Sequence, residues 1–146
     1  MAGTIVVGVD GSDESKDALR WALEEARLRQ TDVRAIYAWR DPYVVAPGYG
    51  LPEDFEFEPL RERAVETLEA VVAEVVGTAS DVHVDRVVVE GPAGTVLVQA
   101  AEDAEMLVVG SRGHGGFVGL FLGSVSQQCV THATCPVLVV RGPRAG

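Results

Sequence analysis

Five short apolar runs alternate along the chain with longer segments in which apolar residues recur every three or four positions. The runs are rich in valine and other β-branched residues, and they span residues 4–9, 33–39, 82–89, 106–109 and 137–140. Several runs are apolar at consecutive positions, which is typical of strands covered on both faces. This alternation predicts an α/β fold in which repeated strand–helix units build an open parallel sheet with helices on both sides.

The segments between the runs carry the start and stop signals of four helices. Ser12 and Asp13 stand ahead of the first apolar stripe as N-cap candidates. The second helix is expected over residues 59–77, because a proline opens this stripe and a glycine closes it. Two shorter helices are expected over residues 94–101 and 123–132, the latter ending before a proline.

Composition limits the classes of protein to consider. The chain has 146 residues, of which 47% are hydrophobic and 23% charged, so we expect a single domain over residues 1–146. Its formal net charge of −10 gives it no general attraction for nucleic acid or for an anionic membrane surface. No apolar run reaches the roughly 18 residues of a membrane span. We therefore expect no nucleic acid and no membrane among its partners.

The two cysteines bear on the compartment. Cys129 and Cys135 lie six positions apart, one in a predicted helix and one just before a predicted strand, which is a poor arrangement for a disulfide. No histidine stands beside them at the spacing of a metal site, so no protein-bound metal is predicted. The N-terminus also lacks a basic segment followed by a long apolar stretch. These features favour a reduced, cytoplasmic protein.

A glycine-rich segment between the fourth strand and the last helix is the main candidate for chemistry. It holds six glycines within 14 residues: Gly110, Gly113, Gly115, Gly116, Gly119 and Gly123. Glycines let successive amides converge on one anion and let a phosphate approach the main chain closely. The N-terminus of the helix that follows adds unpaired amides, and Ser124 and Ser126 add hydroxyls. The segment therefore favours phosphate binding, although a glycine-rich turn that only packs tightly is the alternative.

A second polar turn, Val9-Asp10-Gly11-Ser12, follows the first strand. If the strand order is 3-2-1-4-5, this turn faces the glycine-rich segment across the point where the order reverses.

The spacing of the glycines and of the lysine excludes two other phosphate-binding motifs. Lys16 is the only lysine and does not follow the glycines as a P-loop requires, and the glycines do not match a dinucleotide fingerprint.

The residues resemble those of the universal stress protein family, in its ATP-binding subgroup. That subgroup carries Gly-x2-Gly-x9-Gly followed by Ser or Thr, which Gly110, Gly113, Gly123 and Ser124 match. The likeness runs from the opening IVVGVDGS to the closing CPVLVVR. It implies a Rossmann-like domain of the adenine nucleotide alpha hydrolase kind, similar to the nucleotide-binding half of electron-transfer flavoproteins. With that fold we expect a single open five-stranded parallel sheet in the order 3-2-1-4-5.

The resemblance also implies a set of binding residues. Asp10 contacts the ribose and adenosine side, and Ala38 offers main-chain groups to adenine. The phosphates are wrapped from one side by Gly110, Arg112 and Gly113, and from the other side by Gly123, Ser124, Val125 and Ser126. Mg or Mn accompanies the triphosphate. The full expected set is Val9, Asp10, Ala38, Gly110, Arg112, Gly113, Gly123, Ser124, Val125 and Ser126. The family further implies a homodimer formed through the last strand, Val137–Val140.

The sequence offers few candidates for catalytic residues. His114 is the nearest candidate base in the glycine-rich segment, but it has no evident orienting partner, and Ser12 fits an N-cap better than a nucleophile. Trp21 and Trp39 are expected to be packing residues. We expect a cytoplasmic, ATP-binding stress-response regulator with no catalytic residue and at most slow hydrolysis. A slow ATPase or adenylyl-transfer enzyme, and a dimerisation module without nucleotide, remain the alternatives.

Overall fold

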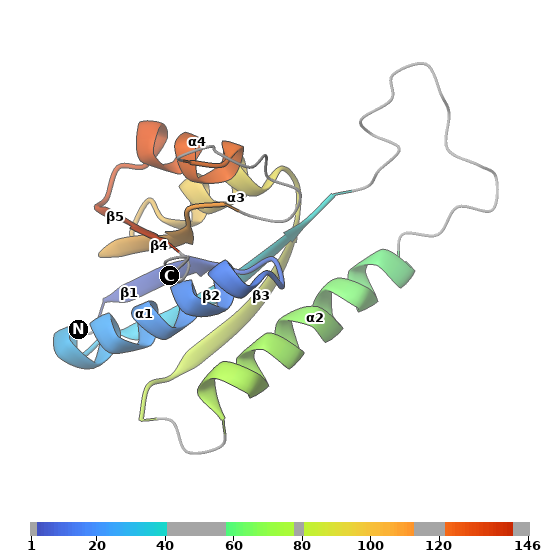
Figure 1. Ribbon diagram of the computed structural model, residues 1–146, viewed down its shortest axis with the longest axis horizontal. Helices are drawn as coiled ribbons and strands as arrows, with labels where there is room; N and C mark the ends of the chain where they lie inside the picture. Colours follow the sequence, from blue (N-terminus) through green and yellow to red (C-terminus); the bar gives the residue numbers. More distant parts are fainter. Residues whose placement is uncertain (1–2, 41–57, 78–80, 113–121, 142–146) are drawn as a thin grey trace, which may run out of the picture.

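The computed structural model describes residues 3–40, 58–77, 81–112 and 122–141, which fold around one parallel sheet (Figure 1). The strands of the described chain are β1 (Thr4–Gly8), β2 (Asp32–Trp39), β3 (Val84–Glu90), β4 (Met106–Gly110) and β5 (Val137–Val140). Its helices are α1 (Asp13–Arg29), α2 (Glu58–Val76), α3 (Ala93–Ala100) and α4 (Ser124–His132). None of these helices is long and apolar enough to cross a bilayer.

The strand order is β3-β2-β1-β4-β5, so the predicted order is confirmed. In the register, Val6 of β1 lies beside Arg34 of β2 on one side and Leu107 of β4 on the other. From β1, in the middle of the sheet, the next strands β2 and β3 are added on one side. The strands β4 and β5 are then added on the other side. The carboxyl ends of β1 and β4 therefore bound the crevice where ligands of such sheets collect.

The helices cover the two faces of the sheet in pairs, α1 and α2 on one face and α3 and α4 on the other (Figure 1). The alternation of side chains in β1 explains this arrangement. Ile5 and Val7 are fully buried against α1 and α2, whereas Val6 is fully buried in the cluster under α3 and α4. Gly8 allows close packing on the second face, because a Cβ there would lie 2.7 Å from Leu97.

Helix α2 follows the predicted stripe closely. Leu68 and Val72 of that stripe are almost fully buried, while Glu66 and Glu69 on other faces of the helix are exposed. Gly77 follows the helix with a φ of +71°, the left-handed conformation that glycine adopts without strain.

Some sequence-based expectations were wrong in detail. Trp21 is 51% exposed, so it is not the packing residue that was expected, because its position on α1 points outward beside α2. The third strand begins at Val84, two residues later than predicted, and α3 begins at Ala93, one residue earlier. Apolar pattern alone places the boundaries of elements poorly, since strand ends and first turns share residue types.

We expect Leu68→Ala to lower the free energy of unfolding by about 2–5 kcal/mol, because it leaves a cavity where a 1% exposed side chain packs on the sheet. Urea denaturation measures this change. Leu28→Ala is the matched control: Leu28 is 79% exposed on α1, and its truncation should change stability by no more than about 0.5 kcal/mol. Equal losses in the two variants would contradict the packing described for α2.

Candidate functional site

The turn after β1 forms one wall of the crevice. The amide of Val9 donates to the carbonyl of Ile36 at 2.9 Å, which continues the β1–β2 pairing one residue past the strand. Gly11 then adopts a φ of +86°, which reverses the chain toward α1. Asp10 is thereby held at the carboxyl end of the sheet, where the expected nucleotide site requires it.

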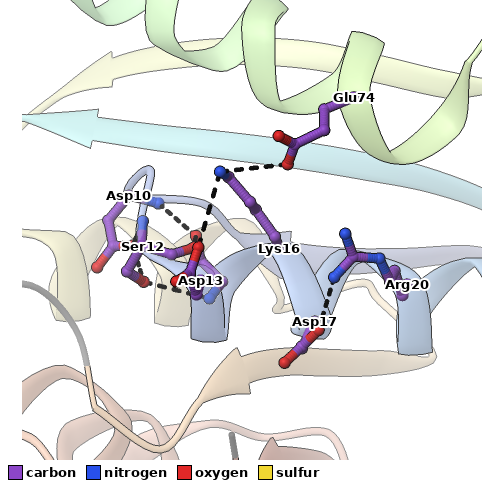
Figure 2. A network of polar contacts seen from close by, with 8 residues as sticks. Asp10, Ser12, Asp13, Lys16, Asp17, Arg20 and Glu74 are labelled. Carbon is purple, nitrogen blue, oxygen red and sulfur yellow. Dashed lines mark hydrogen bonds and ion pairs between the residues drawn. The ribbon is translucent and has the colours of Figure 1, made fainter. Parts of the chain in front are cut away.

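Asp10 and Ser12 fix each other at the start of α1 (Figure 2). The Asp10 Oδ1 atom accepts from the Ser12 amide at 2.9 Å and also from the Ser12 hydroxyl. The Ser12 hydroxyl oxygen in turn accepts from the Ser15 amide at 3.2 Å, which is the geometry of an N-cap. Ser12 is thus the expected cap of α1, and Asp10 has an orientation determined by its neighbours.

Ala38 lies at the carboxyl end of β2, where it pairs with Val89 and is half-buried. Gly8, the last residue of β1, pairs with Ile36 of β2, and Asp10 and Ala38 each stand two positions beyond that pair in the sequence. The two residues expected to face the adenosine therefore lie at neighbouring positions along the same edge of the sheet.

Ser111, directly after β4, connects the elements of the other wall. Its amide donates to Val140 of β5 at 2.8 Å. Its carbonyl accepts from the Gly123 amide at 2.6 Å and from the Ser126 hydroxyl at 2.8 Å. These bonds hold the start of α4 against the end of β4, although 13 residues separate the two elements in the sequence. Sequence reasoning missed Ser111, although its place between two glycine-motif residues was a possible signal.

The first amides of α4 lack hydrogen-bond acceptors within the helix itself. The first hydrogen bond at its start runs from Gln127 to the Gly123 carbonyl at 3.0 Å, so the amides of Ser124, Val125 and Ser126 have no acceptor within the helix. Gly123 caps the helix in an extended conformation without a side-chain bond. The helix dipole and these amides together favour an anion at this end.

Ser126 contributes differently from what was expected. Its side chain is 2% exposed, and its hydroxyl donates to the carbonyls of Ser111 and Gly123 at 2.8 and 3.1 Å. The expectation that this hydroxyl is offered to a ligand is therefore wrong, because burial commits it to the main chain. Ser124 is exposed and retains a hydroxyl at the helix start.

Glu14, in the first turn of α1, is a second residue that sequence reasoning missed. Its Oε2 atom accepts from the Arg112 amide at 2.6 Å and from the Ser111 hydroxyl at 3.0 Å. Its Oε1 atom lies 3.6 Å from the Arg112 guanidinium. Gly110 allows this approach, because a Cβ there would lie 3.0 Å from the Glu14 Cβ and 3.3 Å from its carbonyl carbon.

Lys16 does not contribute to the crevice as a phosphate-binding lysine. Its Nζ atom lies 3.2 Å from Glu74 of α2 and 3.8 Å from Asp13, so it joins the first turn of α1 to α2 (Figure 2).

The remaining candidates from the sequence are two residues of the glycine-rich segment and possible metal ligands. Gly113 and His114 lie outside the described residues. In the described part of the chain, no group of three or more potential metal-ligating side chains is found.

Cys129 and Cys135 are free thiols. Burial, with a smaller contribution from Cys135, raises the pKa of Cys129 to about 11. A thiol with this pKa stays protonated and unreactive at neutral pH.

We expect Ser12→Ala to lower the free energy of unfolding by about 1 kcal/mol, because the Ser15 amide loses its acceptor. Thermal denaturation measures the change. Ser12→Asn keeps a side-chain oxygen and should retain most of the stability. If the alanine variant were as stable as the native protein, the capping role of Ser12 would be wrong.

Comparisons with known proteins identify the family of the chain. A model of the Universal stress protein family matches residues 1–141. Universal stress protein Rv2624c of Mycobacterium tuberculosis is 35% identical over 139 residues, which are 94% of this chain and 48% of that protein. The chain thus spans about half the length of the curated relatives it matches.

Solved structures add the fold. The universal stress protein from Archaeoglobus fulgidus in complex with dAMP is 25% identical, with a TM-score of 0.68 and coverage of 96% of this chain and 98% of that one. A universal stress protein in complex with cAMP is 26% identical, with a TM-score of 0.62 and coverage of 97% and 98%. With the family model matching nearly its whole length, the chain belongs to the Universal stress protein family.

Proposed function

We propose that the protein is a cytoplasmic stress-response regulator that binds ATP in the crevice between the carboxyl ends of β1 and β4. The phosphates lie against the main chain of Gly110, Gly113 and Gly123 and against the amides at the start of α4. The adenosine lies toward Val9, Asp10 and Ala38. The observation that carries the proposal is the helix start held beside β4, with amides at Ser124, Val125 and Ser126 that have no acceptor within the helix.

The solved relatives support an adenine nucleotide as the ligand class. Two universal stress proteins of similar fold are in complex with dAMP and with cAMP. Several amide hydrogen bonds of about 1 kcal/mol each, with apolar contact to adenine, are enough for affinity in the micromolar range, about −8 kcal/mol. Affinity of this order allows occupancy to follow the cellular nucleotide level.

The residues present fit a triphosphate better than a protein-bound metal. The crevice offers amide donors and the exposed hydroxyl of Ser124, which suit phosphate oxygens. The described residues hold no cluster of carboxylates suited to a cation, so Mg or Mn would be held by the phosphates and water. When bound, the ion offsets part of the negative charge of the triphosphate.

We expect Gly123→Val to weaken ATP binding by at least about tenfold, or 1.4 kcal/mol, measured by calorimetry with Mg in excess. Gly123 has φ −74° and ψ 172°, a conformation that valine adopts readily, so the fold should persist while the side chain blocks the amides of α4. By the family motif, Gly113→Val should have the same effect.

Thr134→Val is the matched control, because it places valine at an exposed position just beyond the other end of α4. It should leave ATP affinity unchanged. Full ATP affinity in both glycine variants would contradict the proposed site.

We propose that the outer edge of β5 pairs with a second copy of the chain. Leu107 and Ser111 donate to the carbonyls of Pro136 and Val140 at 2.9 and 2.8 Å. Because backbone groups alternate along a strand, those of Val137 and Val139 face away from β4. This edge is uncharged and β-branched, which makes it prone to pairing unless another strand covers it.

We expect Val139→Pro to convert a dimer into a monomer, because proline removes an amide that faces the open edge and leaves the β4 bonds in place. Sedimentation velocity reports the change in mass. Val139→Thr keeps the amide and the branched shape and should stay dimeric. A native protein that sediments as a monomer at all concentrations would exclude this edge as the interface.

A further inference from the structure

Glu14 and Arg112 form an ion pair at the edge of the proposed nucleotide site, and neither residue lies in a strand. Arg112 follows Ser111 at the carboxyl end of β4, and Glu14 lies in the first turn of α1. The Glu14 side chain is 15% exposed and that of Arg112 is 44% exposed. An ion pair with one partner this well covered is screened less by salt than a pair in open solvent.

The two carboxylate oxygens of Glu14 have separate tasks. Oε2 accepts from the Arg112 amide at 2.6 Å and from the Ser111 hydroxyl at 3.0 Å, which anchors the chain after β4. Oε1 faces the guanidinium at 3.6 Å, too far for a good hydrogen bond but close enough for charge attraction. Any oxygen acceptor in the place of Oε2 can therefore hold the Arg112 amide and the Ser111 hydroxyl. Attraction of the guanidinium, in contrast, requires the negative charge of the carboxylate.

The charge of Arg112 is thus already offset before any ligand binds. A bare arginine beside a phosphate chain favours the ligand with the most phosphate charge. An arginine that is paired with a carboxylate favours the more highly charged ligand less strongly. A phosphate group beside Arg112 either displaces Glu14 from the guanidinium or is repelled by the Glu14 carboxylate.

We infer that Glu14 is a specificity-determining residue of the nucleotide site: by pairing with Arg112, it reduces the preference for triphosphate over monophosphate. This inference rests on the proposed nucleotide binding. Glu14 touches the main chain and Arg112, so it acts on the ligand through Arg112 and is a positioning residue. The protein then accepts ATP and AMP with more similar affinities than its arginine alone would allow.

Glu14→Gln separates the two tasks. A carboxamide oxygen can replace Oε2 as acceptor for the Arg112 amide and the Ser111 hydroxyl, while the amide NH₂ facing the guanidinium carries no charge. Calorimetric titrations of ATP, AMP and adenosine, each with Mg in excess, compare the native chain with this variant. We expect ATP to bind about three- to tenfold more tightly, AMP to gain less than about threefold, and adenosine to be unchanged.

Two further variants test the route through Arg112. In Glu14→Gln combined with Arg112→Gln, the gain for ATP should disappear. Asp13→Asn is the matched control, since it removes a carboxylate from the same turn that is 97% exposed and contacts Lys16. It should change ATP affinity by less than about twofold.

Equal changes for all three ligands, or weaker ATP binding in Glu14→Gln, would overturn the inference while leaving the proposed function intact. A native chain that binds none of the three ligands would instead overturn both. If Glu14→Gln does not fold, Arg112→Gln alone carries the test. It leaves the Glu14 carboxylate without its partner, so its repulsion of phosphate should lower the ratio of ATP to AMP affinity by about three- to tenfold. An unchanged or higher ratio would overturn the inference.

Discussion

The arrangement of the carboxyl edge depends on the hydrogen bonds of Ser111. Its amide binds β5, its carbonyl binds the start of α4 through Gly123 and Ser126, and its hydroxyl binds Glu14 of α1. Three elements from other parts of the sequence, β5, α4 and α1, are thereby held to the residue that follows β4. Ser111 is 3% exposed, so breaking any of these bonds leaves a polar group without water to replace the lost partner. The position of the α4 amides follows from this constraint.

The proposed phosphate site is made of main-chain donors, and this has consequences for charge. The single lysine, Lys16, is paired with Glu74, and Arg112, next to the crevice, is paired with Glu14. At the start of α4, attraction for an anion comes from the amides and the helix dipole, whose field is short in range. Such a site recognises the shape of a phosphate chain at close quarters more than its total charge. This property fits a chain with a formal net charge of −10.

Close packing on the α3–α4 face depends on small residues as much as on large ones. A Cβ on Gly8 would lie 2.7 Å from Leu97, and one on Gly94 would lie 2.1 Å from the Gln128 side chain. These contacts let α3 approach β1 and α4, which keeps α4 beside the sheet. Glycine content is visible in a sequence, but the partner that each glycine admits depends on elements folded from elsewhere in the chain.

The amino-acid sequence by itself determined the α/β class and the presence of a polar turn and a glycine motif after the first and fourth strands, because periodicity and turn chemistry are local properties. The strand order was expected from the family resemblance and is a property of the assembled sheet. It also indicated Ser12 as a cap, since capping involves residues only three positions apart. Only the tertiary structure decided that Ser126 turns its hydroxyl inward and that Glu14 meets Arg112. Those contacts join residues that the chain brings together through the sheet, so their partners depend on packing and not on spacing.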